Sequence, residues 1–272
     1  MDYIVKKILK NIIPKKLINL VSKNFQYNSF RGNFKNFNEI NKKLTNYDSS
    51  KNILRATNAL KIASKSNYLI DRDGEVLQSK NQNFQLLKII SKLLSKSEFN
   101  CVVDYGGSLA NFYRNNYNYL RKYNLIWIVI DNKKICLVGK KLIKKKNIYF
   151  FENLNQVNKF ILSRNLKIVF FLFGSSIQYI QKFEKILKQI KLLKINYIII
   201  DRQPVLRSKK TKYVVQKTPF WNGNFSYAAK LYNSQSLINI FNKNDYFLKK
   251  KFYAFGDQFK DGEYKSYIFK KK

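Results

Sequence analysis

Residues 101–113, CVVDYGGSLANFY, place an acid and two glycines where a strand would give way to a helix. The apolar run 101–103 ends at the carboxylate of Asp104, and Gly106 and Gly107 precede a helix-like stretch that begins near Leu109. Glycine permits positive φ and a close approach of a ligand, which the free N–H groups at the start of a helix then face. Open α/β sheets hold nucleotide-like ligands in this way. A tight turn that binds no ligand can have the same sequence. The rest of the chain therefore has to distinguish a ligand-binding loop from a simple turn.

Acids or small polar residues also follow the other short apolar runs of the chain. Asp131 ends 126–131 (IWIVID), Glu152 follows 147–151 (NIYFF), Gly174 and Ser175 follow 168–173 (IVFFLF), and Asp201 ends 197–201 (YIIID). Ligands of open α/β sheets bind at the carboxyl ends of the strands, so these residues are candidates for one site. Asp131 lies 24 residues after Gly107, which is near the spacing expected of a ribose-binding acid.

Helix-like segments separate these runs, which predicts an open α/β sheet of five buried parallel strands with helices on both faces. The predicted helices cover 52–64, 81–94, 109–122, 155–164, 180–193 and 234–243. Two strand-like runs, 246–255 and 263–269, predict a terminal antiparallel hairpin. Residues 23–52 have an irregular pattern. The segment 71–75 (DRDGE) has the pattern of a turn. Its acids either cap the turn or approach a ligand, and we favour the capping role.

These patterns divide the chain into two parts. We expect an N-terminal helical and irregular extension over 1–78 and an α/β domain over 79–272. An insertion near 205–231 stands where a lid over a substrate would be.

The formal net charge of +37 suggests nucleic-acid binding, but its composition favours another origin. Only eight of the 53 basic residues are arginine, and the sequence is rich in the residues of A- and T-rich codons. Readers of phosphate usually cluster arginine, because its guanidinium binds bidentately. We therefore expect lysines that decorate solvated faces through compositional drift, with non-specific attraction to anions and no specific nucleic-acid partner.

Histidine is absent from the sequence, which excludes Ser-His-Asp and Cys-His catalysis and most zinc sites. Cys101 and Cys136 have no partners at metal-ligand spacing, so we predict no metal site and two small buried hydrophobes in a reducing compartment.

The segment 2–22 alternates aliphatic residues with lysines at helical spacing around Pro14. Such a basic amphipathic helix either lies in a membrane interface or packs on the protein's own core, and the pattern favours neither. No apolar run approaches the roughly 18 residues of a membrane span. We expect a cytoplasmic protein, with peripheral contact at the inner membrane surface as one outcome for residues 2–22.

The order of elements is similar to that of the S-adenosylmethionine-dependent methyltransferase sheet, in which a terminal antiparallel hairpin joins five parallel strands. The resemblance implies that Asp104 and the glycine loop hold the methionine end of this cofactor. It also implies that Asp131 takes the ribose hydroxyls and that Glu152 lies near the adenine amine. The implied cofactor set is Asp104, Gly106, Gly107, Ser108, Asp131, Glu152, Gly174 and Ser175. Ser108 and Ala110 stand where further glycines often occur, which leaves the path of this loop open.

Four segments carry a narrower resemblance. DYGGSL at 104–109, GSSIQY at 174–179, IIIDRQP at 198–204 and VQKTP at 215–219 resemble a bacterial family of little-characterised methyltransferases associated with surface-polysaccharide biosynthesis. Phe34, Phe37 and Tyr47-Asp48, with Arg72-Asp73-Gly74, are similar to its N-terminal part. The resemblance covers most of the chain and implies no particular substrate.

Methyl transfer from a sulfonium is an in-line displacement that depends largely on positioning, so it needs no histidine. For a hydroxyl acceptor, Asp201 or Tyr179 at the strand ends could take the proton, although Asp201 could instead form a structural ion pair with Arg202. The candidate substrate residues are Gln178, Arg202, Lys217 and Trp221.

The sequence thus favours a methyltransferase that acts on a small or sugar-linked acceptor, including lipid- or nucleotide-linked glycans. Two alternatives stay open. A nucleotide- or NAD-dependent sugar-modifying enzyme would bind at the same strand ends, and a basic adaptor without catalytic activity would use the charge alone.

Overall fold

The computed structural model describes residues 29–40, 44, 49–66, 68–72, 74–78, 83–97, 101–218, 225–254, 259 and 261–272. Three regions of the sequence analysis lie outside them, namely the amphipathic segment 2–22, Tyr47-Asp48 and Trp221.

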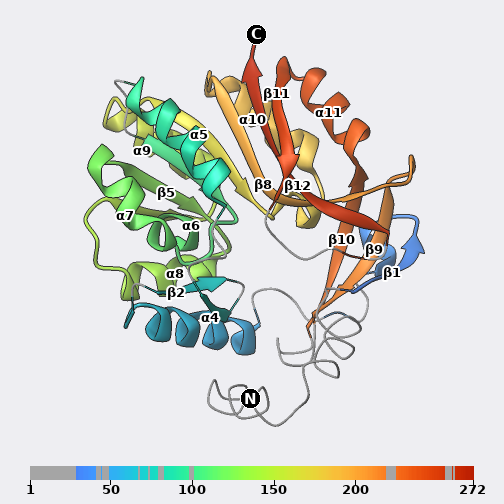
Figure 1. Cartoon of the computed structure of the whole chain (residues 1–272), viewed down its shortest axis with the longest axis horizontal. Coiled ribbons are helices and arrows are strands. Elements are labelled where there is room, and N and C mark those ends of the chain that lie inside the picture. Colours follow the sequence, from blue (N-terminus) through green and yellow to red (C-terminus); the bar gives the residue numbers. More distant parts are fainter. Residues whose placement is uncertain are drawn as a thin grey trace.

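A mostly parallel sheet forms the centre of the molecule (Figure 1). Its five parallel strands are β4 (Cys101–Tyr105), β5 (Ile126–Ile130), β6 (Ile148–Phe151), β7 (Ile168–Gly174) and β8 (Tyr197–Leu206). They lie in the order β6-β5-β4-β7-β8. The chain moves outward from β4 through β5 to β6 and then returns to place β7 on the other side of β4. The order of the strands therefore reverses between β4 and β7, where ligands of open α/β sheets bind.

The terminal hairpin extends this sheet beyond β8. Strand β12 (Gly262–Lys271) is antiparallel to both β8 and β11 (Tyr246–Tyr253). Because β12 lies between them, β11 runs in the same direction as the five parallel strands. The predicted sheet of five parallel strands with a terminal antiparallel hairpin is confirmed.

Helices pack on both faces of the sheet, because successive strand residues point to opposite sides. Helices α9 (Leu154–Ser163), α10 (Phe183–Leu192) and α11 (Ser234–Asn242) share one apolar cluster, which includes Val103. Helices α5 (Phe84–Ser95), α6 (Asn111–Asn115), α7 (Tyr117–Leu120) and α8 (Lys133–Leu142) contribute to the other, which includes Val102. The central strands β4, β5 and β7 are thus buried along most of their length on both faces.

The helix predicted over 109–122 is interrupted. Asn116 separates α6 from α7, and its side-chain Nδ2 donates to the carbonyl oxygen of Phe112 over 2.7 Å. An asparagine that bonds to a local backbone group competes with the helical hydrogen-bond ladder, which explains the break. A 3₁₀ turn, η3 (Arg121–Tyr123), then leads to β5.

Part of the region with an irregular pattern is a strand. β1 (Ser29–Phe34) is antiparallel to β9 (Lys212–Lys217), which is in turn antiparallel to β10 (Ser226–Asn233). The last residues of β10 pair with the end of β8, so these strands continue the sheet. The partner of β1 lies far along the chain, and a local pattern could not reveal this pairing. The short helix α3 (Phe37–Ile40) follows β1.

Helix α4 (Ser50–Ala63) and the hairpin β2 (Leu69–Arg72)–β3 (Glu75–Gln78) lie below the carboxyl ends of the central strands in Figure 1. Leu60 of α4 packs with Leu109 and Ile135. The N-terminal segment thereby reaches the end of the sheet where a ligand would bind. Among the helices described, none has the length and apolar character needed to cross a membrane.

Candidate functional site

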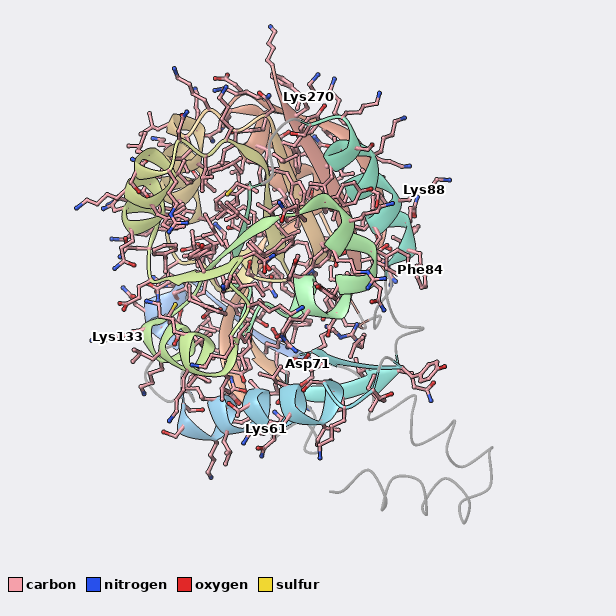
Figure 2. All side chains as sticks on the ribbon, turned by 90° about the vertical axis from the view of Figure 1, so that its left-hand side faces the viewer. Lys61, Asp71, Phe84, Lys88, Lys133 and Lys270 are labelled. Atoms are coloured by element: carbon pink, nitrogen blue, oxygen red, sulfur yellow. The ribbon has the colours of Figure 1, made fainter. Side chains whose placement is uncertain are left out.

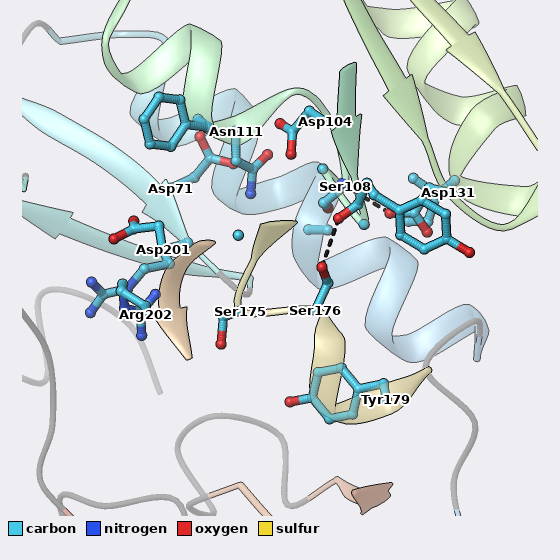
Figure 3. A pocket seen from close by; sticks show the side chains of 18 of the residues that line it. Asp71, Asp104, Ser108, Asn111, Asp131, Ser175, Ser176, Tyr179, Asp201 and Arg202 are labelled. Carbon is cyan, nitrogen blue, oxygen red and sulfur yellow. Dashed lines mark hydrogen bonds between the residues drawn. The ribbon is translucent and has the colours of Figure 1, made fainter. Parts of the chain in front are cut away.

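A cavity of about 490 Å³ lies at the carboxyl ends of β4, β5 and β7, at the point where the strand order reverses. It also borders the middle of β8, because this strand continues past Asp201 to Leu206 and does not end at Asp201 as the sequence predicted. This volume falls within the ~300–1,000 Å³ typical of small-molecule sites. Figure 3 shows Asp104, Ser108 and Asp131 on one side of it and Asp201 with Arg202 on the other. The sheet thus gathers residues that the sequence spreads over a hundred positions.

Gly106 brings the loops after β4 and β7 together. It has a φ of +73°, and its N–H donates to the carbonyl oxygen of Ile130 over 2.7 Å. A Cβ added to it would lie 2.6 Å from the Cβ of Ser176, which is too close for any other residue. The hydroxyl of Ser176 donates to the carbonyl oxygen of Tyr105 over 2.7 Å (Figure 3). The chain therefore needs glycine at 106 both for its conformation and for the contact between the loops.

Asp104 lies beneath this loop and is 1% exposed. Its Oδ2 accepts a hydrogen bond from Trp127 Nε1–H over 3.3 Å. Burial is the main cause that raises the pKa of Asp104 to about 7; the Trp127 hydrogen bond opposes this shift, and the charges of Asp131 and Asp201 add to it. A cation in the cavity would stabilise the ionised form of this carboxyl.

Asp131 follows β5 and faces the same loop. Its Oδ2 accepts from the N–H of Ser108 over 2.9 Å, and its Oδ1 accepts from the N–H and the side-chain Nδ2 of Asn132 over 2.8 and 3.0 Å. Burial raises its pKa to about 6, although these hydrogen bonds oppose the shift. A carboxylate has about four lone-pair sites, so three donors leave one for a ligand hydroxyl on Oδ2. Ser108 itself has a φ of +51°, which aims its N–H at this oxygen.

The wall beyond Asp131 is apolar at its base and acidic at its rim. Ile130 and Ile135, which flank Asp131 along the chain, line the cavity and are buried. On the α6 side of the lining, Phe112 stacks on Trp127. Glu152, directly after β6, also lines it with an exposed side chain. This wall combines a flat apolar surface with an acceptor at its edge.

Asp201 occupies the opposite side of the cavity and is buried. Its Oδ1 accepts from Asn83 Nδ2 over 2.9 Å and from the hydroxyl of Ser266 over 2.8 Å. These two neutral donors fix the carboxylate from α5 and β12. Its carbonyl oxygen accepts from the N–H of Ser175, so the loop after β7 is tied to β8 as well.

Tyr179 belongs to the 3₁₀ turn η4 (Ile177–Tyr179) and lines the cavity beside β9 and β10. Its hydroxyl donates to Gln216 Oε1 over 2.7 Å. Its ring lies edge-on to that of Tyr227, which stacks with Phe225. These contacts make β9 and β10, within the insertion expected at 205–231, one wall of the cavity.

The structure brings together the whole predicted cofactor set together with Asp201, Tyr179 and Arg202 at one cavity. Gln178 and Lys217 are not among its lining residues. Gln178 is 1% exposed, and its Nε2 donates to the carbonyl oxygen of Ser175 over 2.7 Å, so it holds the loop from inside. Lys217 is exposed at the end of β9.

Sequence reasoning favoured a capping role for Asp71, and the structure contradicts it. Asp71 lines the cavity from β2, and both of its carboxylate oxygens accept from Arg114 Nη2, over 2.6 and 2.7 Å. Asn115 Nδ2 also donates to the carbonyl oxygen of Asp71 over 2.7 Å. These bonds fasten the β2–β3 hairpin to α6. The partners lie more than forty positions apart, so no local spacing could have indicated the pair.

Asn116 is another lining residue that the sequence did not single out. It is 6% exposed, and its side-chain Oδ1 is buried with no hydrogen-bond partner within the described part of the chain. A buried acceptor of this kind normally has a partner, so a ligand donor would satisfy it. Across the same described residues, no group of three or more histidine, cysteine or acidic side chains could hold a metal ion.

No protein-family model and no curated relative matches the sequence. Solved structures do match. The CcbJ methyltransferase from Streptomyces caelestis is 8% identical over 68% of this chain and 89% of its own, with a TM-score of 0.44. An S-adenosylmethionine-dependent methyltransferase from Clostridium acetobutylicum is 11% identical over 71% and 92%, with a TM-score of 0.46. Magnesium protoporphyrin IX methyltransferase from Synechocystis, with bound S-adenosylhomocysteine, is 11% identical over 71% and 84%, with a TM-score of 0.45. At such values, the function has to be argued from the cavity's own residues.

Proposed function

We propose that this protein is an S-adenosylmethionine-dependent methyltransferase that acts on a small or sugar-linked acceptor. The observation that carries this proposal is the pair Asp104 and Asp131, which lie at the carboxyl ends of the neighbouring strands β4 and β5, beside a glycine loop at the reversal of strand order. Such a position receives the nucleoside part of a ligand in open α/β sheets.

The residues present fit this cofactor. Asp131 retains one acceptor site for a ribose hydroxyl, and the apolar wall with Glu152 at its rim suits an adenine ring with its amine. Asp104 and the buried Oδ1 of Asn116 suit the cationic amino group of the methionine part. Gly174 adds room, because a Cβ there would meet no protein atom within 4 Å.

When bound, the cofactor supplies an electrophilic methyl group on a sulfonium. The protein then has to hold an acceptor in line with this methyl group and receive a proton from that acceptor. Asp201 is the better proton acceptor of the two candidates. In the described part of the chain, both side-chain hydrogen bonds of Asp201 go to Oδ1, so the lone pairs of Oδ2 remain for the proton of an acceptor. Tyr179 donates its own proton to Gln216, so its oxygen orients the acceptor through a lone pair.

The sequence resemblance of four segments to methyltransferases associated with surface-polysaccharide biosynthesis supports a glycan-type acceptor, lipid- or nucleotide-linked, in a cytoplasmic setting. The peripheral membrane contact of residues 2–22 is a proposal of the same origin, and its test is co-sedimentation with anionic liposomes before and after deletion of that segment.

Calorimetric titration tests the proposed cofactor. S-adenosylmethionine and S-adenosylhomocysteine should bind saturably at one site, and Asp131→Ala should weaken both by about tenfold or more through loss of the ribose contact. Glu184→Ala, which removes an exposed acid from α10, is the matched control and should bind as the wild type does. Saturable binding of NADH together with failure of both sulfur compounds to bind would favour the sugar-modifying alternative and overturn the proposal.

A further inference from the structure

The basic residues that line the cavity are all arginines. The chain has 45 lysines and eight arginines, yet the described lining holds Arg55, Arg72 and Arg202 and no lysine. Figure 2 shows labelled lysines such as Lys61 and Lys133 at the outer surface, where they are exposed. Compositional drift toward lysine therefore accounts for the surface, and the cavity departs from it.

We propose that these three arginines bind a phosphate or diphosphate group of the methyl acceptor. This inference rests on the proposed function, and it names the class of acceptor for that same site. A guanidinium presents a planar fork of donors that matches phosphate oxygens bidentately, which an ammonium group cannot do.

Arg55 and Arg72 reach the cavity from neighbouring parts of the N-terminal segment. Arg55, on α4, donates from Nη2 to the carbonyl oxygen of Gly74 over 3.4 Å, in the turn that follows Arg72. The guanidinium of Arg55 also lies 5.3 Å from the ring centre of Phe225, beside the wall that contains Tyr227. Both arginines are half-buried, so water competes only in part for their donors.

Arg202 comes from the sheet and is held in an unusual conformation. Its φ is +52°, within a strand whose pairing with β12 shifts register between Lys265 and Tyr267. Non-glycine residues in this left-handed region carry strain, and such strain is concentrated at functional sites. Its guanidinium lies 5.9 Å from the ring centre of Tyr264, which also lines the cavity. The bulge thus aims Arg202 differently from a regular strand residue.

Arg202 lies on the side of the cavity opposite Asp104 and Asp131 (Figure 3). Asp71, which precedes Arg72 in β2, is paired with Arg114. The other end carries Asp104, Asp131 and Glu152. An acidic end suits the cationic cofactor, and the basic end suits a group with about two negative charges, such as a phosphate ester. An acceptor held by that group would place a nearby hydroxyl beside Asp201, the residue before Arg202.

The experiment uses the full-length protein saturated with S-adenosylhomocysteine and titrates it with inorganic phosphate, pyrophosphate or acetate at about 0.15 M salt, which screens the surface lysines. Pyrophosphate should bind at one site, more tightly than phosphate, and acetate should bind at least about tenfold more weakly. The variants Arg55→Gln, Arg72→Gln and Arg202→Gln should each weaken pyrophosphate binding by about tenfold, and Arg202→Lys should not restore it.

Arg121→Gln and Arg207→Gln are the matched controls, because both side chains are exposed and outside the cavity lining. Equal pyrophosphate affinity in the cavity variants and in these controls would overturn the inference, as would acetate binding that equals that of phosphate. In either case, unchanged binding of S-adenosylhomocysteine leaves the proposed function standing. If S-adenosylhomocysteine does not bind the wild-type protein, the proposed function is wrong. Pyrophosphate titration of the cofactor-free protein then still measures binding at the three arginines. Thermal melting identifies any variant that fails to fold. If Arg202→Gln fails to fold, Arg202→Lys replaces it in the test, because lysine retains the positive charge.

Discussion

The carboxylate of Asp104 lies directly against Gly107, where an added Cβ would stand 2.6 Å from both Cγ and Oδ2 of Asp104. The loop can close over the buried acid only if residue 107 has no side chain. The glycine and the acid therefore depend on each other, and both together shape the floor of the cavity. This relationship explains the DYGG order of the segment in physical terms.

Gly107→Ala should displace the Asp104 carboxylate or lift the loop from it. We expect a loss of about 1–3 kcal/mol in the free energy of unfolding, as for other overpacked sites, together with much weaker cofactor binding. Gly174→Ala is the control for stability, because its Cβ would meet no protein atom within 4 Å. Denaturant unfolding and calorimetry measure the two effects. An equal stability of the two alanine variants would contradict the contact.

The stability of the protein should fall as pH rises through the range in which the buried acids ionise. The pKa of Asp104 is raised from 3.8 to about 7 and that of Asp131 to about 6, so the folded state binds more protons than the unfolded state between these values. Stability from these groups is fully present below about pH 4 and is lost by about pH 7.

Asp104→Asn should remove much of this pH dependence. The amide oxygen can still accept from Trp127, so the variant should gain about 3 kcal/mol over the wild type between about pH 5 and pH 8. Urea unfolding of both proteins at about pH 5 and pH 8 measures the change in the free energy of unfolding between the two pH values. The contributions of the other charges cancel when the change in the wild type is subtracted from that in the variant. Parallel pH profiles for the two proteins would show that Asp104 does not carry the raised pKa.

Cofactor binding should have the opposite pH dependence. A cationic ligand favours the ionised carboxylates, so S-adenosylmethionine should bind more tightly at about pH 8 than at about pH 5.5 and should release protons near pH 6–7. Titrations in two buffers of different ionisation enthalpy measure the proton release. Asp104→Asn should release fewer protons, whereas uptake of protons by the wild type would contradict the assignment of a cation to this end.

The sequence was sufficient for the five parallel strands, for the terminal hairpin and for the residues near the ends of the first strands. Short apolar runs identified the parallel strands, and Asp104, Gly106 and Asp131 directly follow or end two of them, so their positions at the cavity came with the topology. Residues from outside the strand ends could not be found in this way. Arg55 and Asn116 reach the cavity through tertiary packing of α4 and through a break in a helix, neither of which leaves a periodic signal.

The sequence was also insufficient to predict what each side chain near the cavity does. The sequence placed Gln178 among the substrate residues because it follows a strand, but its side chain turns inward to the carbonyl oxygen of Ser175. Proximity along the chain predicted the right loop, whereas the direction of the side chain depends on that loop's three-dimensional path. The positive φ of Ser175, +54°, contributes to this path and is atypical of serine.

The buried pair of Asp71 and Arg114 provides a last prediction, because it joins the β2–β3 hairpin to α6 at the edge of the cavity. The side chains are 2% and 13% exposed. Removal of one partner from such a pair leaves an uncompensated buried charge, so Asp71→Asn should cost about 3 kcal/mol of unfolding free energy. Opening of the hairpin should also carry Arg72 away from the cavity and weaken pyrophosphate binding, while binding of S-adenosylhomocysteine at the opposite end changes less. The matched control is Asp245→Asn, which breaks the exposed pair with Lys191 and should leave stability unchanged. Denaturant unfolding, with hydrogen exchange of residues 69–78 as the local readout, tests the role of the pair. Similar stabilities for the two variants, with the exchange of the hairpin unaltered, would contradict the view that this pair fastens the hairpin.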